Sequence, residues 1–159
     1  MDAVFSISLP RQAYTVAVAR DVLGTLLVRA GVCRSCVDDI LLAVSEACDN
    51  AIDHGEPASG YMVEAEMGGS WCQLRISHTG RVHDPAALAE RFAAERMPLP
   101  GLESESGRGI LLMRYLMDEV AFEGEPRATV LLRKRLTSCD GPSLERPTGG
   151  IPVQRYALL

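Results

Sequence analysis

The sequence has no apolar segment of the ~20 residues that a membrane-spanning helix needs, because arginines and acids interrupt its longest apolar runs. Its first residues, M-D-A-V-F, lack the basic segment followed by an apolar stretch that marks a secretory signal. Internal repeats are also absent. From these absences we expect a cytoplasmic protein with no membrane partner.

Cysteines are few, and their number is odd: the chain has five. An odd count in a chain of 159 residues favours reduced thiols over a disulfide framework. Cys33 and Cys36 form a C-x-x-C pair, which invites a metal or redox interpretation. A structural zinc site needs about four ligands. Because the sequence offers no second pair, we favour small buried or half-buried thiols.

Basic side chains are missing from residues 38–70, which carry eight acidic ones, and the net charge of the chain is -5. Such an acidic stretch repels nucleic acid and can attract a basic protein surface or a divalent cation. We therefore expect no direct contact with nucleic acid. The remaining composition, 47% hydrophobic and 23% charged residues, is ordinary for one soluble globular domain.

Patterns of apolar residues predict an α+β two-layer sandwich, in which helices cover one face of a mixed, largely antiparallel sheet. We expect this domain to span residues 1–136 and to be followed by a flexible tail, rich in Gly, Pro and Ser, over residues 137–159. Strands are expected at 3–9, 61–67, 71–77, 120–123 and 129–135, and helices at 11–30, 38–55, 86–95 and after residue 109.

Turn and cap residues add local detail to this scheme. Gly31 is expected to end the first helix. Ser35, with Asp38 three residues later, resembles the capping box that begins a helix. Gly68 and Gly69 predict the turn of a β-hairpin.

The second predicted helix has one apolar arc and one polar arc, and the polar arc includes Asp39. Glu46 and Asn50 are neighbours at i,i+4 on the polar arc, and Asp53 follows one turn later. A carboxylate and an amide placed in this way can hold a hydrated Mg²⁺, and a glutamate beside them can accept a proton from a nucleophile. The alternative is a solvated helix face, since most surface acids have no catalytic role.

Residues 46–55 read E-A-x-x-N-A-x-x-H-G. This motif resembles the N box of the GHKL (Bergerat-fold) ATPases, which share the histidine-kinase-like ATPase fold, and in particular that of the bacterial anti-sigma-factor serine kinases. The resemblance implies that Glu46 is the general base and that Asn50 carries Mg²⁺. Asp53 and His54 would lie beside the bound ATP.

Residues 78–85, which follow a predicted strand, resemble the G1 box D-x-G-x-G of the same family. Gly80 matches this motif, whereas His78 stands at the position of the Asp and Val82 at that of the second Gly. The family's Asp accepts a hydrogen bond from the adenine amino group. A neutral histidine can accept through one ring nitrogen only, and a protonated one cannot accept at all.

The turn Gly107-Arg108-Gly109 comes just before an apolar run, where the resembled family has its G2 box after a mobile ATP lid. Glycines at the start of a helix let backbone amides approach a phosphate, and Arg108 adds a full positive charge. Thr129 stands at the family's G-T position near the adenine pocket, with Ala128 replacing the Gly.

The resemblance implies an ATP- and Mg²⁺-dependent regulatory protein: an anti-sigma factor with serine/threonine kinase activity, often a homodimer. Its implied partners are a sigma factor and an anti-anti-sigma protein of the STAS type, bound through the first helix and its surroundings. Because of His78 and Val82, a non-catalytic binding module of the same fold is the alternative. A fragment of a histidine kinase is a third possibility, against which the short lid and the missing phosphoacceptor helix count.

Overall fold

The computed structural model describes residues 3–55, 59–79, 105–124 and 127–136. Within these ranges the strands are β1 (Ala3–Leu9), β2 (Tyr61–Gly68), β3 (Trp71–His78), β4 (Glu119–Glu123) and β5 (Ala128–Arg135). The helices are α1 (Tyr14–Arg29), α2 (Arg34–His54) and α4 (Glu105–Leu116). The helix expected at 86–95, the tail at 137–159, Gly80 and Val82 lie outside the described residues.

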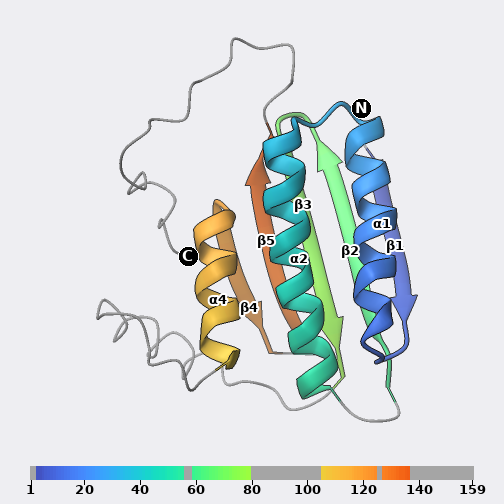
Figure 1. The fold of residues 1–159 in the computed structure, drawn as a ribbon. Coiled ribbons are helices and arrows are strands. Elements are labelled where there is room, and N and C mark those ends of the chain that lie inside the picture. The colour runs from blue at the N-terminus through green and yellow to red at the C-terminus, as the bar shows by residue number, and fades with distance from the viewer. Residues whose placement is uncertain (1–2, 56–58, 80–104, 125–126, 137–159) are drawn as a thin grey trace.

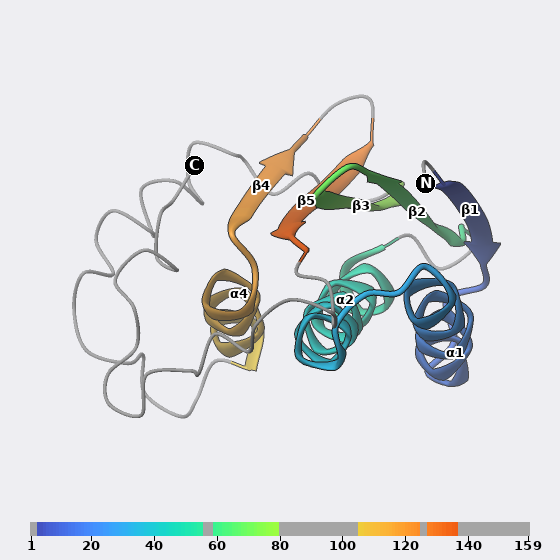
Figure 2. The same cartoon turned by 90° about the horizontal axis from the view of Figure 1, so that it is seen from above.

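The strands form one five-stranded sheet in the order β1-β2-β3-β5-β4, in which every pair is antiparallel. All of the described helices lie side by side on one face of this sheet, with α2 between α1 and α4 (Figures 1 and 2). The predicted α+β two-layer sandwich is therefore confirmed, with the difference that the described pairings are wholly antiparallel. No helix in the described part of the chain combines the length and apolarity needed to cross a bilayer.

The apolar arc predicted for α2 faces the core. Its buried members are Ile40, Val44, Ala47, Cys48 and Ala51, each at most 1% exposed. They pack on inward-facing side chains of the central strands, which share a hydrophobic cluster with them. Burial of this arc stabilises the fold by roughly 25 cal/mol for each Å² of apolar surface removed from water. It also fixes the rotation of α2 about its axis.

The β2–β3 hairpin closes one residue later than the glycine pair suggested. Gly68 pairs with Trp71, so the two-residue loop consists of Gly69 and Ser70. Gly69 has a φ of 58°, which glycine adopts without steric cost. Strand pairing therefore continues to Gly68, and only the second glycine serves the turn.

The boundaries of α1 differ slightly from the sequence-based expectation. The helix starts at Tyr14 rather than Arg11, because Pro10 and Gln12 accept turn hydrogen bonds from the amides of Gln12 and Thr15. At its end, Gly31 has a φ of 77° and its amide donates to Val28 O, while the amide of Val32 donates to Leu27 O. This pair of bonds is a Schellman motif, so the glycine stop was predicted correctly.

The capping box expected at Ser35 does not form. The N-cap of α2 is Cys33, which makes no side-chain capping bond, and Ser35 lies inside the first turn. Its hydroxyl donates to Cys33 Sγ at 3.7 Å instead. The helix starts earlier because Val37 N–H already donates to Cys33 O at 3.0 Å.

The described cysteines are thiols, as their odd number in the sequence predicted. Cys33 is half-buried and Cys36 is buried. Burial raises the pKa of the Cys48 and Cys72 thiols to about 12, so these two are protonated at neutral pH. Among the described residues, no group of three His, Cys, Asp or Glu side chains forms a metal site.

The C-terminal end of α2 is held by Arg11, whose guanidinium donates to Ile52 O. A cation at this end satisfies a helix carbonyl and interacts favourably with the helix dipole. Gly55 leaves room for it: a Cβ there would lie 2.8 Å from Arg11 Nε and 2.7 Å from Ala51 O. The glycine that closes the E-A-x-x-N-A-x-x-H-G motif therefore permits this close approach.

The only lysine of the chain, Lys134, lies on β5 and is buried under the helices. Its ammonium donates to Leu116 O, the last residue of α4, at 2.6 Å and to Asp39 Oδ2 on α2 at 3.0 Å. The side chains are 6% and 13% exposed. Lys134 thus ties the C-terminal end of α4 to α2. Asp39, which the helical wheel placed on the polar arc, is covered.

Lys134→Met should destabilise the fold by up to ~3–5 kcal/mol, because it leaves the Asp39 carboxylate buried without its lysine. Replacing both residues, as Lys134→Met with Asp39→Leu, should recover much of that loss. Urea denaturation measures both. Arg34→Met, which removes an ion pair with side chains 89% and 64% exposed, is the control and should change stability by less than ~0.5 kcal/mol. A double variant no more stable than Lys134→Met would contradict the assignment.

Candidate functional site

The polar face of α2 carries the candidate catalytic side chains. Glu46 and Asn50 are half-buried, whereas Asp49 and Asp53 are exposed. Since 3.6 residues make one turn, Glu46 and Asn50 lie one above the other on this face. Core packing on the opposite side of α2 keeps both side chains directed away from the sheet.

The N-terminal half of α4 lies against this face. Because α4 begins at Glu105, the Gly107-Arg108-Gly109 segment lies inside the helix and not, as the sequence suggested, in a turn before it. Gly109 is buried there, and a Cβ built on it would lie 2.7 Å from Glu46 Oε2. Arg108, the preceding residue, is exposed. The N-terminal end of α4 lies near the C-terminal half of α2, because the two helices run in opposite directions (Figure 1). The structure therefore brings together the two motifs that carry Glu46 and Gly107–Gly109.

Burial and neighbouring acids change the acidity of this face. The pKa of Glu46 is raised, first by desolvation and then by the negative charge of Asp49. The pKa of Asp49 is raised in turn by desolvation and by Asp53. A carboxylate with a raised pKa is a stronger base at neutral pH, so Glu46 is better suited to accept a proton than an ordinary surface glutamate.

His78 and Thr129 lie at the same end of the sheet but face different sides of it. His78 ends β3, is 7% exposed and pairs with Tyr61 and Ala128. Thr129 pairs with Ser77, so strand alternation directs it to the opposite face. Its hydroxyl donates to Arg127 O at 3.2 Å. The described geometry therefore places Ala128, rather than Thr129, directly across from His78.

The residues present suit a Mg²⁺–nucleotide. Magnesium usually keeps several waters and takes one or two protein oxygens besides phosphate oxygens. The Asn50 amide oxygen could therefore bind the ion as its single protein ligand. The N-terminal amides of α4 and the Arg108 guanidinium offer positive charge for phosphates. His54 is half-buried at the end of α2.

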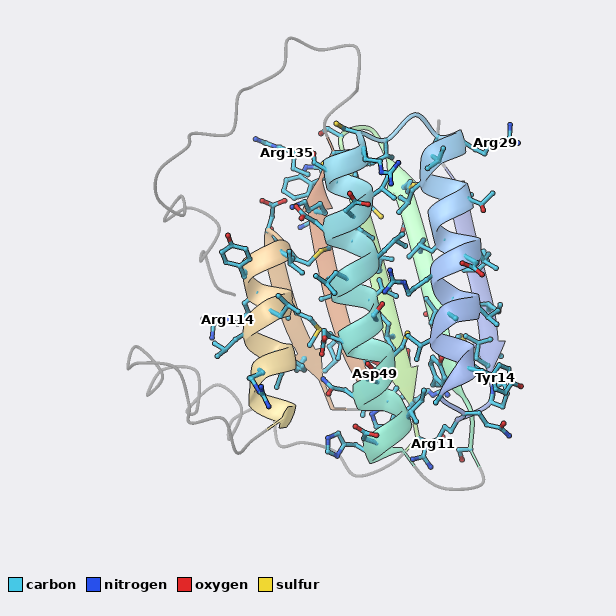
Figure 3. The ribbon with its side chains drawn as sticks, viewed as in Figure 1. Arg11, Tyr14, Arg29, Asp49, Arg114 and Arg135 are labelled. Atoms are coloured by element: carbon cyan, nitrogen blue, oxygen red, sulfur yellow. The ribbon has the colours of Figure 1, made fainter. Side chains whose placement is uncertain are left out.

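Two residues that contribute to this region, Asp49 and Arg11, were not identified from the sequence. Asp49 is three residues after Glu46 and raises its pKa, a neighbour relation that helical spacing could have revealed. Figure 3 shows Asp49 on the C-terminal half of α2 and Arg11 near the end of that helix. No local pattern indicated Arg11, because its contact with Ile52 O joins distant parts of the chain.

Comparisons with curated proteins find several relatives named serine-protein kinase RsbW. The chain is 29% identical over 153 residues to the serine-protein kinase RsbW of Bacillus licheniformis, covering 92% of this chain and 91% of that protein. It is 27% identical over 170 residues to RsbW of Bacillus pumilus, covering 96% and 94%. RsbW of Listeria innocua is 27% identical over 139 residues, covering 81% and 85%.

The fold resembles a solved structure, the RsbU and RsbW domains of Rv1364c from Mycobacterium tuberculosis, with a TM-score of 0.62. That match has 20% identity and covers 84% of this chain but only 32% of the other, so it supports the fold alone. The model of the histidine kinase-like ATPase domain family matches residues 9–134. Since this match spans most of the sequence, the chain belongs to the histidine kinase-like ATPase domain family.

Proposed function

We propose that this protein is an ATP-dependent serine/threonine protein kinase that acts as an anti-sigma factor. The observation that carries the proposal is the contact between the Glu46 carboxylate and the Gly109 position in the N-terminal half of α4. It joins a candidate base to a candidate phosphate-binding helix end in a family of ATPase-like domains. Curated relatives that carry the name serine-protein kinase support the same reaction.

In this proposal the α4 N-terminus and Arg108 bind the phosphates of ATP, and the Asn50 amide oxygen holds Mg²⁺. The metal would neutralise the charge that develops on the transferring phosphoryl group. Glu46 would accept the proton of the attacking serine hydroxyl as that oxygen bonds to the γ-phosphorus. The bond from this phosphorus to the β–γ bridging oxygen would break at the same time, with ADP as the leaving group. Its raised pKa favours that role. Asp53, His54, His78 and Gly80 remain predicted nucleotide contacts, whereas Thr129 lies on the face of the sheet opposite His78.

The proposed partners are a sigma factor and an anti-anti-sigma protein of the STAS type, met in the cytoplasm by a homodimer of this chain. The exposed face of α1 would contribute to partner binding, with Arg20 and Arg29 on its surface. Arg20 is oriented by a 3.1 Å hydrogen bond from its Nη1 to Ser45 Oγ on α2. An ordered guanidinium loses less side-chain entropy when it pairs with an acidic partner.

Glu46→Gln should abolish phosphoryl transfer from ATP to a STAS-type substrate while the protein stays folded, because the amide is of similar size but cannot take the serine proton. A radiolabelled phosphate-transfer assay with circular dichroism measures both effects. Glu66→Gln makes the same change at an exposed position on the opposite face of the sheet and should retain activity. Full transfer by Glu46→Gln would remove Glu46 from the catalytic role.

A binding module without nucleotide is the second candidate function, and the buried His78 at the adenine-reading position favours it. The module would bind its partner through the same scaffold but would have lost adenine recognition.

Isothermal titration with ATP and Mg²⁺ separates the two functions. The kinase should give saturable heat, which Asn50→Ala should weaken because a metal-binding oxygen is lost. A flat titration for the native chain, together with binding regained by His78→Asp, would establish the module instead. A carboxylate at that position can accept a hydrogen bond from the adenine amino group.

A further inference from the structure

Gly109 occupies a helical position where nothing in the backbone calls for glycine. It lies within α4, and the described glycines with positive φ are Gly31 and Gly69 alone. Glycine disfavours a helix relative to alanine, because it loses more backbone entropy on folding. Its presence here therefore needs another explanation, either a ligand or a neighbouring side chain.

The neighbour of Gly109 is the candidate base. The three heavy atoms nearest to a Cβ built on Gly109 all belong to Glu46: Oε2 at 2.7 Å, Cδ at 3.7 Å and Cβ at 3.8 Å. Carbon and oxygen atoms that are not bonded do not approach to 2.7 Å without repulsion, so any side chain at this position would displace the carboxylate. The contact involves the end of a flexible side chain, and α4 itself would not have to move.

A second helical glycine provides a comparison. Gly24 lies in α1, and a Cβ there would lie 3.2 Å from Leu41 Cδ1, which is also a side chain of α2. This site allows close packing of an apolar group. Both glycines thus make room for a side chain of α2, but only at Gly109 is that side chain a titratable group with a proposed role.

We propose that Gly109 is a positioning residue: by having no side chain, it allows the Glu46 carboxylate to stay against the N-terminal half of α4. This inference rests on the proposed function for its catalytic consequence, but the contact itself does not depend on it. It gives the second glycine of the Gly107-Arg108-Gly109 segment a purpose other than access for a phosphate. Desolvation of Glu46, which raises its pKa, is consistent with a carboxylate held in this covered position.

Gly109→Ala should move the Glu46 carboxylate without unfolding the protein. The direct measurement is the ¹³C signal of the Glu46 carboxyl carbon, assigned from its loss in Glu46→Gln. We expect this signal to shift in Gly109→Ala and to stay in place in Gly24→Ala, the matched control. The midpoint of urea denaturation should not fall, because alanine favours the helix. An unshifted Glu46 signal in Gly109→Ala would overturn the proposal, whether or not the protein binds ATP.

The kinetic consequence is a reduced kcat with unchanged affinity for ATP. A base displaced by about 1 Å can cost roughly 100-fold in rate, so we expect a loss of that order in Gly109→Ala and none in Gly24→Ala. A weakened ATP affinity with the Glu46 signal in place would show that the glycine serves the phosphate instead. If the native chain binds no ATP, the proposed function fails, while the carbon signal still decides the contact.

A shortened base tests the steric explanation further. Glu46→Asp withdraws the carboxylate toward α2 and should lower kcat in the native background, because the base no longer reaches the serine hydroxyl. In the Gly109→Ala background the same change should cost much less, since the added methyl group has already displaced the longer side chain. Equal losses in the two backgrounds would contradict a steric coupling between residues 46 and 109.

Discussion

The packing of α2 on the sheet is the constraint on which the rest of the structure depends. Its apolar arc is buried to 1% exposure or less, and this burial leaves the helix one orientation about its axis. The polar arc must then point away from the core, and at Glu46 it is a neighbouring helix that covers it. Because α4 lies beside α2, Glu46 becomes half-buried and its pKa rises. The chemistry proposed for this glutamate is thus a consequence of core packing.

Each end of the α2–α4 pair is fixed by a cation at a helix C-terminus. Arg11 donates to Ile52 O near the end of α2, and Lys134 donates to Leu116 O at the end of α4. Lys134 also pairs with Asp39, so a single buried ammonium joins both helices to β5. Charged groups in such places are stable only when hydrogen-bonded. Lys134, which contacts both helices, restricts how they can shift against each other and thereby helps to keep Gly109 against Glu46.

Glycine has different physical roles along this chain. At Gly31 and Gly69 it supplies a positive φ that ends a helix or closes a hairpin. At Gly55 and Gly109 it supplies space, in the first case for Arg11 and the backbone and in the second for a carboxylate. The first role can be read from turn patterns in the sequence. The second depends on which distant side chain approaches, and no local pattern contains that information.

Much of the fold could be predicted from the sequence, because strand alternation, helical spacing and turn residues are local properties. The faces of α2, the stop at Gly31 and the antiparallel hairpin follow from them. Errors arose where a long-range or competing contact intervened: Cys33 caps α2 instead of Ser35, and Asp39 is covered because Lys134 reaches it from β5. Thr129 shares its motif position with the resembled family, but the strand register turns it away from His78.

The sequence by itself determined which side chains share the polar face of α2 and so are candidates for the chemistry, because a carboxylate and an amide at i,i+4 lie on one helix face in any protein. Only the tertiary structure decided that Glu46 meets Gly109, that burial raises the pKa of this glutamate, and that Lys134 is buried under two helices. The physical reason is the range of the forces involved. Backbone geometry acts over a few neighbouring residues, whereas desolvation and steric contact depend on every segment that the fold brings near.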